Sequence, residues 1–303
     1  PFAAAYTGNS LVAWWLALAY VIFGVSYALK GKKPFRPVLP ACLSVMTLCA
    51  TLFCSMAYLD TGKGMFTALD VGQGQCIAII SKTGTVVVDC GGTGTKNAGD
   101  RAADYLLGQG RGSIDLLVLT HFHKDHAGGV EALFSRLDVK RLALSIDISD
   151  EDGLRDRILE QARESGTEII YVTENLEASV GGINLKLFAP MGSADSNERG
   201  IIVMASIGDF DALITGDANT AVERKLLSSA TLPDMELLIV GHHGSRYSTS
   251  QDLLDAAAPE FAIISVGYNN YGHPTSQVLR RLDEAGIDIY RTDLMGNISI
   301  RLN

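Results

Sequence analysis

A cluster of histidines constrains the fold of this chain more than any other feature of its sequence. Three of the six histidines lie in the segment Thr-His-Phe-His-Lys-Asp-His at residues 120–126, directly after the apolar run Leu-Leu-Val-Leu. Alternate side chains of a strand point the same way, so His121 and His123 project together, while Asp125 and His126 face the same space from the turn into a helix. Imidazole and carboxylate groups bind Zn²⁺, Mn²⁺ or iron, and two neighbouring pairs of them predict two metal ions.

Residues 61–303 alternate between short β-rich runs and amphipathic stretches. Such alternation predicts a layered α/β domain in which helices cover both faces of a sheet system. The predicted strands span residues 66–71, 76–81, 85–90, 116–120, 141–146, 168–172, 184–189, 201–207, 212–215, 237–240, 262–266 and 298–302. The predicted helices span residues 100–108, 130–137, 150–165, 221–227, 251–257 and 277–285.

Two long stretches without a charged residue, 10–29 and 37–59, set the first sixty residues apart. Each is long enough to span the hydrocarbon core of a bilayer, and the basic residues between them would hold the intervening loop in the cytoplasm. A cleaved signal peptide is the alternative for the first stretch, but no basic segment precedes it. We therefore expect a transmembrane hairpin over residues 1–60 of a longer multi-pass protein of the cell membrane, and an extracytoplasmic domain over residues 61–303.

The charge of the chain limits its partners. Residues 1–60 carry four basic side chains and one acidic side chain, whereas the whole chain has a formal charge of −9. The remaining domain is therefore acidic, and it repels phosphate unless a local site overcomes the repulsion. This excludes a broadly basic protein that wraps nucleic acid in a groove. A hydrophobic content of 47% also excludes intrinsic disorder.

Two cysteines, Cys76 and Cys90, bracket a segment of two β-rich runs joined by a turn near Thr83. This turn sets the two cysteines opposite each other. In an oxidising compartment they could form a cross-strand disulfide. Two buried free thiols are an equally good interpretation.

The histidine segment resembles the signature of the metallo-β-lactamase superfamily. Other marks of that superfamily follow in order, namely Asp89 in VVVDCGG, Asp217 in LITGDA and a histidine in VGHHGS. The resemblance covers about residues 65–303 and implies an αββα sandwich. Within the superfamily, the chain most resembles the ComEC family, the DNA-uptake channels of competent bacteria. This narrower resemblance rests on three further motifs, LDVGQGQ, GHHGSRYSTS and NNYGHP.

The resemblance implies two divalent metal ions, Mn²⁺ or Zn²⁺, and a set of ligands for them. His121 and His123 would bind the first ion, Asp125 and His126 the second, and Asp217 would bridge the two. Asp125 is therefore also expected to be essential for catalysis.

Three more histidines are given roles by the resemblance. His243, next to a glycine, would bind the second ion, and His242 would contact the scissile phosphate or protonate the leaving group. Extended backbone would point these two rings to opposite sides, and one of them could instead be a structural histidine. His273 in the NNYGHP motif is predicted to touch the phosphate and to act in catalysis.

One position departs from enzymes with three histidines on the first ion. The third histidine is expected near Asn197, twenty residues before Asp217, where the sequence has none. Asn197 would bind the ion through its amide oxygen or hold a water. Ligation richer in oxygen favours Mn²⁺.

Acidic and amide side chains near the ligands are predicted to support them. Asp70 and Asp89 would orient ligand imidazoles through the second ring nitrogen. Alternatively, each only accepts hydrogen bonds from nearby backbone amides. Gln73 lies in the turn DVGQGQ, whose glycines let the backbone approach closely, and it is predicted to contact substrate.

Substrate contacts are also predicted from residues that flank the motifs. Ser245, Ser248 and Thr249 precede a predicted helix whose N-terminal amides could bind an anion, although a residue here could equally well cap that helix. Lys124 and Arg246 are the basic residues nearest to the site in sequence, and they would offset the acidic field locally.

The HHGS and YGHP motifs favour phosphodiester hydrolysis, and the resemblance implies a metal-dependent DNA nuclease at the outer mouth of an uptake channel. An additional imidazole suits the protonation of an alkoxide leaving group. The expected partners are DNA, the membrane, the channel-forming part of the same longer protein, and competence DNA receptors. The alternatives are a phosphorylcholine-esterase-like or acyl hydrolase, and a non-catalytic module that docks DNA to the channel. The full ligand set argues against the last, because a scaffold needs no open two-metal site.

Overall fold

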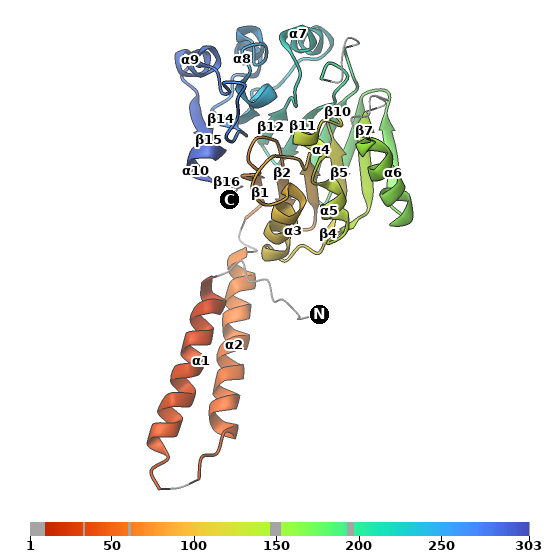
Figure 1. Ribbon diagram of the computed structural model, residues 1–303. Helices are drawn as coiled ribbons and strands as arrows, with labels where there is room; N and C mark the ends of the chain where they lie inside the picture. The colour runs from red at the N-terminus through yellow and green to blue at the C-terminus, as the bar shows by residue number, and fades with distance from the viewer. Residues whose placement is uncertain (1–9, 33, 60–61, 146–152, 193–196, 303) are drawn as a thin grey trace. The chain divides into compact units, whose positions relative to one another are not determined.

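The computed structural model describes residues 10–32, 34–59, 62–145, 153–192 and 197–302 (Figure 1). Two compact units make up the chain, residues 1–62 with 107–110, and residues 63–106 with 111–303. The first three residues of the helix predicted over 150–165 lie outside the described residues.

The first unit contains a hairpin of two helices, α1 (Ser10–Leu29) and α2 (Val38–Leu59), neither of which has a charged residue. The indole Nε1 of Trp15 on α1 donates to the carbonyl oxygen of Ser44 at 2.9 Å and to the hydroxyl of Thr47 at 3.2 Å, which ties the helices together. Within the described ranges, however, no helix combines the length and the hydropathy that a membrane span requires. The predicted pair of helices is present, but the prediction that it crosses a membrane is not supported.

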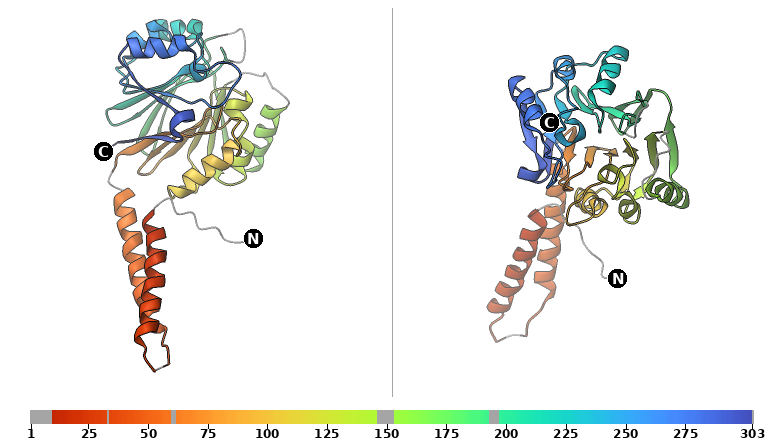
Figure 2. Two further views of the ribbon diagram at one scale, coloured as in Figure 1. Left: turned by 60° about the vertical axis from the view of Figure 1, so that its left-hand side comes forward. Right: turned by 45° about the horizontal axis from the view of Figure 1, so that its top comes forward.

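The second unit contains two seven-stranded sheets that lie face to face (Figure 2). The first sheet has the order β16-β1-β2-β3-β5-β7-β8 and the second the order β15-β14-β13-β12-β11-β10-β9, while β4 and β6 form a short separate pair. The strands are β1 (Gly64–Ala68), β2 (Ile77–Ser81), β3 (Thr85–Val88), β4 (Ser113–Ile114), β5 (Leu116–Leu119), β6 (Asp138–Val139), β7 (Arg141–Ser145), β8 (Glu168–Val172), β9 (Leu176–Val180), β10 (Ile183–Phe188), β11 (Ile202–Ile207), β12 (Phe210–Ile214), β13 (Leu237–Ile239), β14 (Phe261–Ile264), β15 (Asp288–Arg291) and β16 (Ile298–Leu302).

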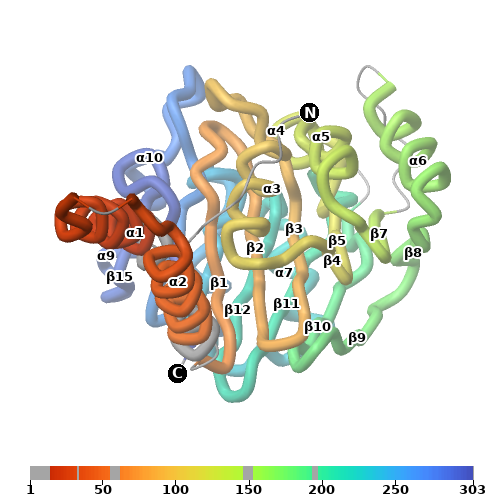
Figure 3. Tube along the Cα trace, turned by 90° about the horizontal axis from the view of Figure 1, so that it is seen from below, coloured from red at the N-terminus to blue at the C-terminus, as the bar shows by residue number. Residues whose placement is uncertain are grey.

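Helices cover the outer face of each sheet, with α3, α5 and α6 on the first (Figure 3) and α7, α8 and α9 on the second (Figure 1). This arrangement confirms the predicted αββα sandwich. The helices of the second unit are α3 (Ala98–Gly108), α4 (Lys124–Ala127), α5 (Val130–Phe134), α6 (Leu154–Glu164), α7 (Thr220–Ser229), α8 (Gln251–Ala257), α9 (Ser276–Glu284) and α10 (Thr292–Met295), with the 3₁₀ turn η1 at Gly241–Gly244.

The alternation of side chains along each strand explains the layers. Inward-facing residues of both sheets, such as Ile79 in the first and Val203 in the second, form one core between the sheets. The alternate residues of the second sheet, such as Leu238 and Ile264, pack instead against its helices. Central parallel strands are buried on both faces, which is why β5 is a continuous apolar run.

The position of the candidate metal site follows from the parallel strands of the two sheets. β3, β5, β7 and β8 are parallel neighbours in the first sheet, and β12, β13, β14 and β15 in the second. Parallel neighbours need crossover connections, which the helices provide, and the loops after the carboxyl ends of such strands are the usual place for binding residues. Every predicted metal ligand except Asn197 follows the end of β5, β12 or β13.

Candidate metal centre

His121, His123 and Asp217 form a first group of potential metal ligands, with one ligand atom of each within 4.8 Å of the others. The ring centroids of His121 and His123 lie 4.6 Å apart, and Nε2 of His121 lies 3.8 Å from Oδ2 of Asp217. The two histidines follow β5 and are separated by the buried Phe122. Strand alternation therefore explains why they face the same side.

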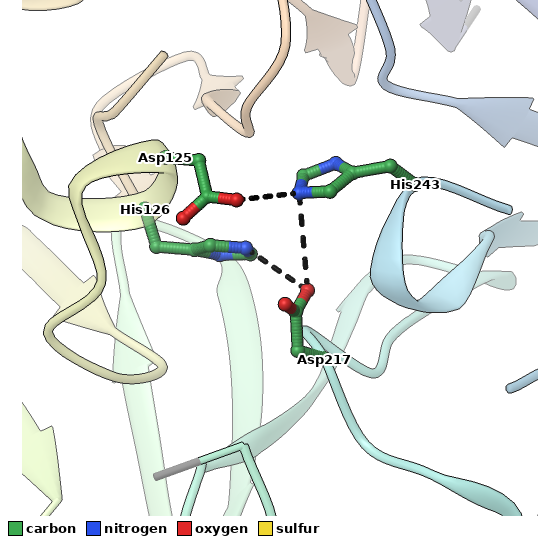
Figure 4. Close-up of side chains that lie close together, drawn as sticks. All are labelled: Asp125, His126, Asp217 and His243. Atoms are coloured by element: carbon green, nitrogen blue, oxygen red, sulfur yellow. Dashed lines mark hydrogen bonds and ion pairs between the residues drawn. The ribbon is translucent and has the colours of Figure 1, made fainter. Parts of the chain in front are cut away.

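Asp125, His126, Asp217 and His243 form a second group (Figure 4). Nε2 of His126 lies 3.0 Å from Oδ1 of Asp217, and Nε2 of His243 lies 4.0 Å from the same oxygen. Nε2 of His243 also lies 3.3 Å from Oδ2 of Asp125. Asp217 belongs to both groups and is buried, which is the arrangement expected of a carboxylate shared by two ions.

Among the described residues, four buried polar atoms of the predicted metal ligands make no hydrogen bond. They are Nε2 of His121, Nε2 of His126, Oδ1 of Asn197 and Oδ1 of Asp217. The second and fourth of these atoms are the pair that lies 3.0 Å apart. Buried polar atoms are nearly always paired, because leaving one unpaired costs about 1–3 kcal/mol. Imidazole nitrogen with carboxylate and amide oxygen is a donor set that suits divalent transition metals. The residues present therefore fit a metal site.

Asp89 supports the second group from the end of β3. Its Oδ2 lies 2.7 Å from Nδ1 of His126 and accepts from the hydroxyl of Thr120 and the side-chain amide of Gln75, both at 2.8 Å. Its Oδ1 accepts from the backbone N–H of Thr120 at 2.7 Å. These contacts fix the His126 ring so that Nε2 points to Asp217. Asp89 thus takes the predicted position, whereas Thr120 and Gln75 are not among the residues that the sequence singles out.

Protons and a metal ion compete for His126. Burial alone would lower the pKa of His126, but the carboxylates of Asp217 and Asp89 on either side of the ring raise it well above its ordinary value. Burial alone would raise the pKa of Asp217, yet His126 and His243 hold it well below its usual range. Since a ligating imidazole is neutral, a cation that binds Nε2 of His126 must displace its proton.

We expect Asp89→Asn to weaken metal binding about 10- to 100-fold, the usual cost of removing the partner of a ligating histidine. The new amide nitrogen cannot accept from Thr120, Gln75 and the His126 N–H, so the ring loses its orientation. Competition titration of Mn²⁺ against a chromophoric chelator measures the change. Asp156→Asn on α6 is the control, because that carboxylate is 78% exposed. Unchanged affinity in Asp89→Asn would limit Asp89 to a structural role.

His242 and His243 lie in the short turn η1, with left-handed φ values of 49° and 55°. The backbone is not extended here, so the argument from strand alternation does not apply. The turn instead brings both rings to one carboxylate, with Nε2 of His242 3.4 Å from Oδ2 of Asp217. His243 is buried and its Nδ1 hydrogen-bonds to the carbonyl oxygen of Ser265 at 2.8 Å, which leaves Nε2 for a metal. His242 is 32% exposed and belongs to neither ligand group.

A cavity of about 470 Å³ opens beside the two groups. His273 lines it, with its ring centroid 5.6 Å from that of His242. Burial, together with the neighbouring His242 and His243, lowers the pKa of His273, which favours the neutral ring. Thr93 and Tyr271 line the cavity too and are not among the predicted residues, although Tyr271 lies within NNYGHP. The predicted site residues on its wall are Gln73, His123, Lys124, Asp125, Asn197, Asp217, His242, His243 and His273.

The turn at residues 71–75 approaches the site as its glycines predict. A β-carbon at Gly74 would lie 2.7 Å from the carbonyl oxygen of Asp125, so no side chain fits there. Gln73 lines the cavity, and its Oε1 accepts from the backbone N–H of Gly267 at 3.3 Å. Gln73 therefore also holds this turn to the loop after β14.

The carboxylate of Asp70 contacts a backbone amide and a guanidinium. Its Oδ1 accepts from the backbone N–H of Gly72 at 3.2 Å, and its Oδ2 lies 3.5 Å from Nη1 of Arg101. These contacts do not support the prediction that Asp70 orients a metal ligand. The contact with Gly72 is the kind that the alternative interpretation expects.

Glu223 on α7 occupies the amides that were predicted to bind an anion. Its buried carboxylate accepts from the backbone N–H groups of Thr249 and Ser250, and Ser250 caps α8 through the N–H of Leu253. Burial raises the pKa of Glu223, although these amides lower it. A phosphate would meet this carboxylate, so the predicted substrate contact of Thr249 is not supported. The cavity wall also lacks Ser245 and Ser248.

The two basic residues near the site lie in different places. Lys124 lines the cavity. The guanidinium of Arg246 packs 4.7 Å from the ring centroid of Tyr247 and donates to its hydroxyl at 2.6 Å. Arg246 is not a lining residue, so the predicted contact with substrate is not supported for it.

Cys76 and Cys90 are buried and are not joined by a disulfide. A hydrogen bond with the Cys90 side chain, together with burial, raises the pKa of the Cys76 thiol well above its ordinary value. Of the two interpretations offered by the sequence, the structure has the buried free thiols.

Residues 69–268 match the metallo-beta-lactamase superfamily. Since the match covers more than half of the chain, the chain belongs to this superfamily. Its fold and its cluster of potential ligands define a metallo-hydrolase domain with a candidate metal site.

Three known proteins are similar to the chain and confirm the resemblance to the ComEC family. ComE operon protein 3 of Bacillus subtilis (strain 168) is 28% identical over 272 residues, which cover 84% of this chain and 35% of that protein. Competence protein ComA of Neisseria gonorrhoeae is 28% identical, covering 78% of this chain and 32% of that protein. Recombination protein 2 of Haemophilus influenzae is 26% identical over 87% of this chain and 32% of its own length. The chain thus spans about a third of the length of these relatives.

Solved structures share the fold. The diiron β-hydroxylase CmlA from Streptomyces venezuelae superposes with a TM-score of 0.55 and 16% identity over 80% of this chain and 54% of that one. Igni18, a metallo hydrolase from Ignicoccus hospitalis, superposes with a TM-score of 0.50 and 15% identity over 79% of this chain and all of that one. At such low identity the similarity concerns the fold alone.

Proposed function

We propose that this domain is a metal-dependent phosphodiesterase that cleaves DNA during its uptake by competent cells. One observation carries the proposal, namely that two imidazoles, His242 and His273, line the cavity outside both ligand groups and lie 5.6 Å apart between ring centroids. Hydrolysis of an activated lactam or ester needs no such pair, whereas a poor alkoxide leaving group needs a proton donor.

The proposed chemistry divides between the metal and the chain. Two divalent ions, when bound, would neutralise charge on the phosphate and activate water. His242 lies at the cavity wall beside the shared Asp217, where it can protonate the leaving oxygen. His273 has a buried Nδ1 without a hydrogen-bond partner, and as a neutral ring it would hold a phosphate oxygen through its N–H.

We further propose Mn²⁺ rather than Zn²⁺ as the working metal. The first group has two histidines and the shared carboxylate. The buried, unpaired Oδ1 of Asn197 would complete it at the cavity wall. An amide oxygen is a harder and weaker ligand than a third imidazole, which favours Mn²⁺.

The biological setting follows from the similarity to competence proteins. A domain of this kind would act on DNA outside the cytoplasm, together with the channel-forming part of a longer protein and competence DNA receptors. The chain spans about a third of the length of these relatives, so its interaction with such partners is part of what we propose. Two other functions are kept as outcomes of the test, a phosphorylcholine-esterase-like or acyl hydrolase and a non-catalytic docking module.

The test uses the whole chain with three substrates, labelled single-stranded DNA, a choline phosphodiester and a chromogenic lactam, each with Mn²⁺, with Zn²⁺ and with chelator. We expect cleavage of the DNA in Mn²⁺ and none with chelator. His121→Ala and Asp125→Ala should abolish cleavage while circular dichroism stays unchanged, because His121 follows the end of β5 and Asp125 lies in the short helix α4. Preferred cleavage of either small substrate would favour another hydrolase. DNA binding without cleavage in either metal would favour the docking module.

A further inference from the structure

The loop between β14 and α9 presents two exposed tyrosines close in sequence, of which one lines the cavity. Tyr271 is 75% exposed and lines the cavity, whereas Tyr268 is 91% exposed and does not. Single exposed aromatic residues are common and mean little by themselves. The position of Tyr271 on the wall beside His273 is what requires an explanation.

The backbone around Tyr271 is fixed by one side chain. Nδ2 of Asn269 donates to the carbonyl oxygens of Gly267 at 2.9 Å and His273 at 2.8 Å. Oδ1 of Asn269 accepts from the backbone N–H groups of Tyr271 at 3.0 Å and His273 at 3.1 Å. Both N–H donors and both acceptor positions of the Asn269 amide are therefore used in hydrogen bonds within this loop. The backbone of Tyr271 is therefore held in place before any ligand arrives, which lowers the entropy cost of binding.

A row of three rings runs from the mouth of the cavity to the shared carboxylate. The ring centroids of Tyr271 and His273 lie 6.0 Å apart, and those of His273 and His242 lie 5.6 Å apart. Nε2 of His242 then lies 3.4 Å from Oδ2 of Asp217. A phosphate held at His242 and His273 therefore has its own nucleoside within reach of the Tyr271 ring.

Charge makes an aromatic contact valuable here. The chain carries a formal charge of −9 and two carboxylates, Asp125 and Asp217, stand on the cavity wall. General attraction to the phosphate backbone is weak for such a domain. Stacking on an aromatic ring works for every base, is independent of net charge, and requires that the base is unpaired.

We propose that Tyr271 is a stacking platform for an unpaired nucleobase beside the scissile phosphate, so that the preferred substrate is a single strand of nucleic acid. This inference rests on the proposed phosphodiesterase function of the site. It names Tyr271 as a determinant of specificity beside the scissile phosphate.

The experiment compares two oligonucleotides, one of thymidines and one in which the nucleotides flanking the cleavable phosphodiester are abasic. The whole chain is used as wild type, Tyr271→Ala, Tyr271→Phe and, as a matched control on the same loop, Tyr268→Ala. Cleavage is measured as kcat/KM in Mn²⁺, and binding is measured by calorimetry with chelator. We expect the wild type, Tyr271→Phe and Tyr268→Ala to prefer the thymidine strand about tenfold in both assays, the order expected of one stacked base. Tyr271→Ala should lose this preference while cleaving the abasic strand normally.

Two results would overturn the stacking role. One is a wild type that binds both strands equally, and the other is a Tyr271→Ala variant that loses the same factor on both strands, as expected if the tyrosine only positions His273. Failure of the proposed function looks different, because the wild type would then cleave neither strand. A binding preference that depends on Tyr271 would still support the platform in that case.

Discussion

Asp217→Ala should release the bound metal and lower the rate of phosphodiester cleavage by at least about 10³-fold, since several kcal/mol of charge stabilisation are lost with the ions. The reason is geometric. Among the described residues, Asp217 alone belongs to both groups of potential ligands. Its removal also leaves Nε2 of His126 without the carboxylate 3.0 Å away. Metal content after dialysis against Mn²⁺, measured by mass spectrometry, and kcat/KM on single-stranded DNA give the two readouts.

Asp209→Ala is the matched control for this variant. Asp209 lies in the exposed turn between β11 and β12, so its loss removes the same charge far from the ligands. It should keep its metal and its activity. If Asp217→Ala retained two equivalents of metal per chain, the assignment of Asp217 as the shared ligand would fail.

The candidate ligands that lie together in the structure are those whose motifs follow a buried parallel strand. The continuous apolar run of β5 fixes where that strand ends, and the backbone alternation after it fixes the side on which His121 and His123 lie. The parallel order of β12 and β13 then brings Asp217 and His243 to the same edge. The pairing of β12 with β13 joins segments that lie 25 residues apart, and it was the family resemblance that assigned Asp217 and His243 to the site.

The strands that the sequence missed are mainly edge strands. β9 and β15 stand at the two ends of the second sheet, and each has exposed or half-exposed residues along most of its length. Such a strand buries few side chains, so its pattern resembles that of a loop. The short pair β4 and β6 was missed because two residues are too few to show any period.

The support of the site depends on contacts between segments far apart in the sequence, and these are invisible in a single chain read in order. Glu223 lies on α7 and holds the amides of Thr249 and Ser250, more than twenty residues away. No local pattern marks a buried glutamate of this kind. Asp70 is the opposite case, since it belongs to a site motif and yet contacts Gly72 and Arg101.

The backbone of the histidine pair was also beyond sequence reasoning. Left-handed φ at two successive non-glycine residues is strained, and such strain persists where the surrounding structure enforces it, often at functional sites. Here the turn is held by the hydrogen bond from His243 to the Ser265 carbonyl and by the close approach of Gly244 to Pro274. In this strained conformation the rings of His242 and His243 both face Asp217. In an extended strand, only one of the two would face it.

Separate variants of His242 and His243 should therefore have different effects. His243→Ala removes a buried ligand and leaves the Ser265 carbonyl unpaired, so metal content and activity should fall together. His242→Ala should keep both ions and bind DNA, yet lose about 10²–10⁴-fold in rate, the usual contribution of a general acid. Metal content, DNA binding and kcat are measured on the same samples, and rescue of His242→Ala by added imidazole would mark a lost proton donor.

Asparagine variants keep this test independent of backbone strain. Asparagine tolerates the left-handed region better than alanine does, so His242→Asn and His243→Asn preserve the turn while removing the imidazole. If each asparagine variant behaves as its alanine counterpart, the effect belongs to the ring and not to the backbone. Loss of metal in both His242 variants, with full occupancy in both His243 variants, would exchange the two roles. That outcome would make the half-exposed ring the ligand and the buried one the proton donor, against the contacts of His243 with Asp125 and Asp217.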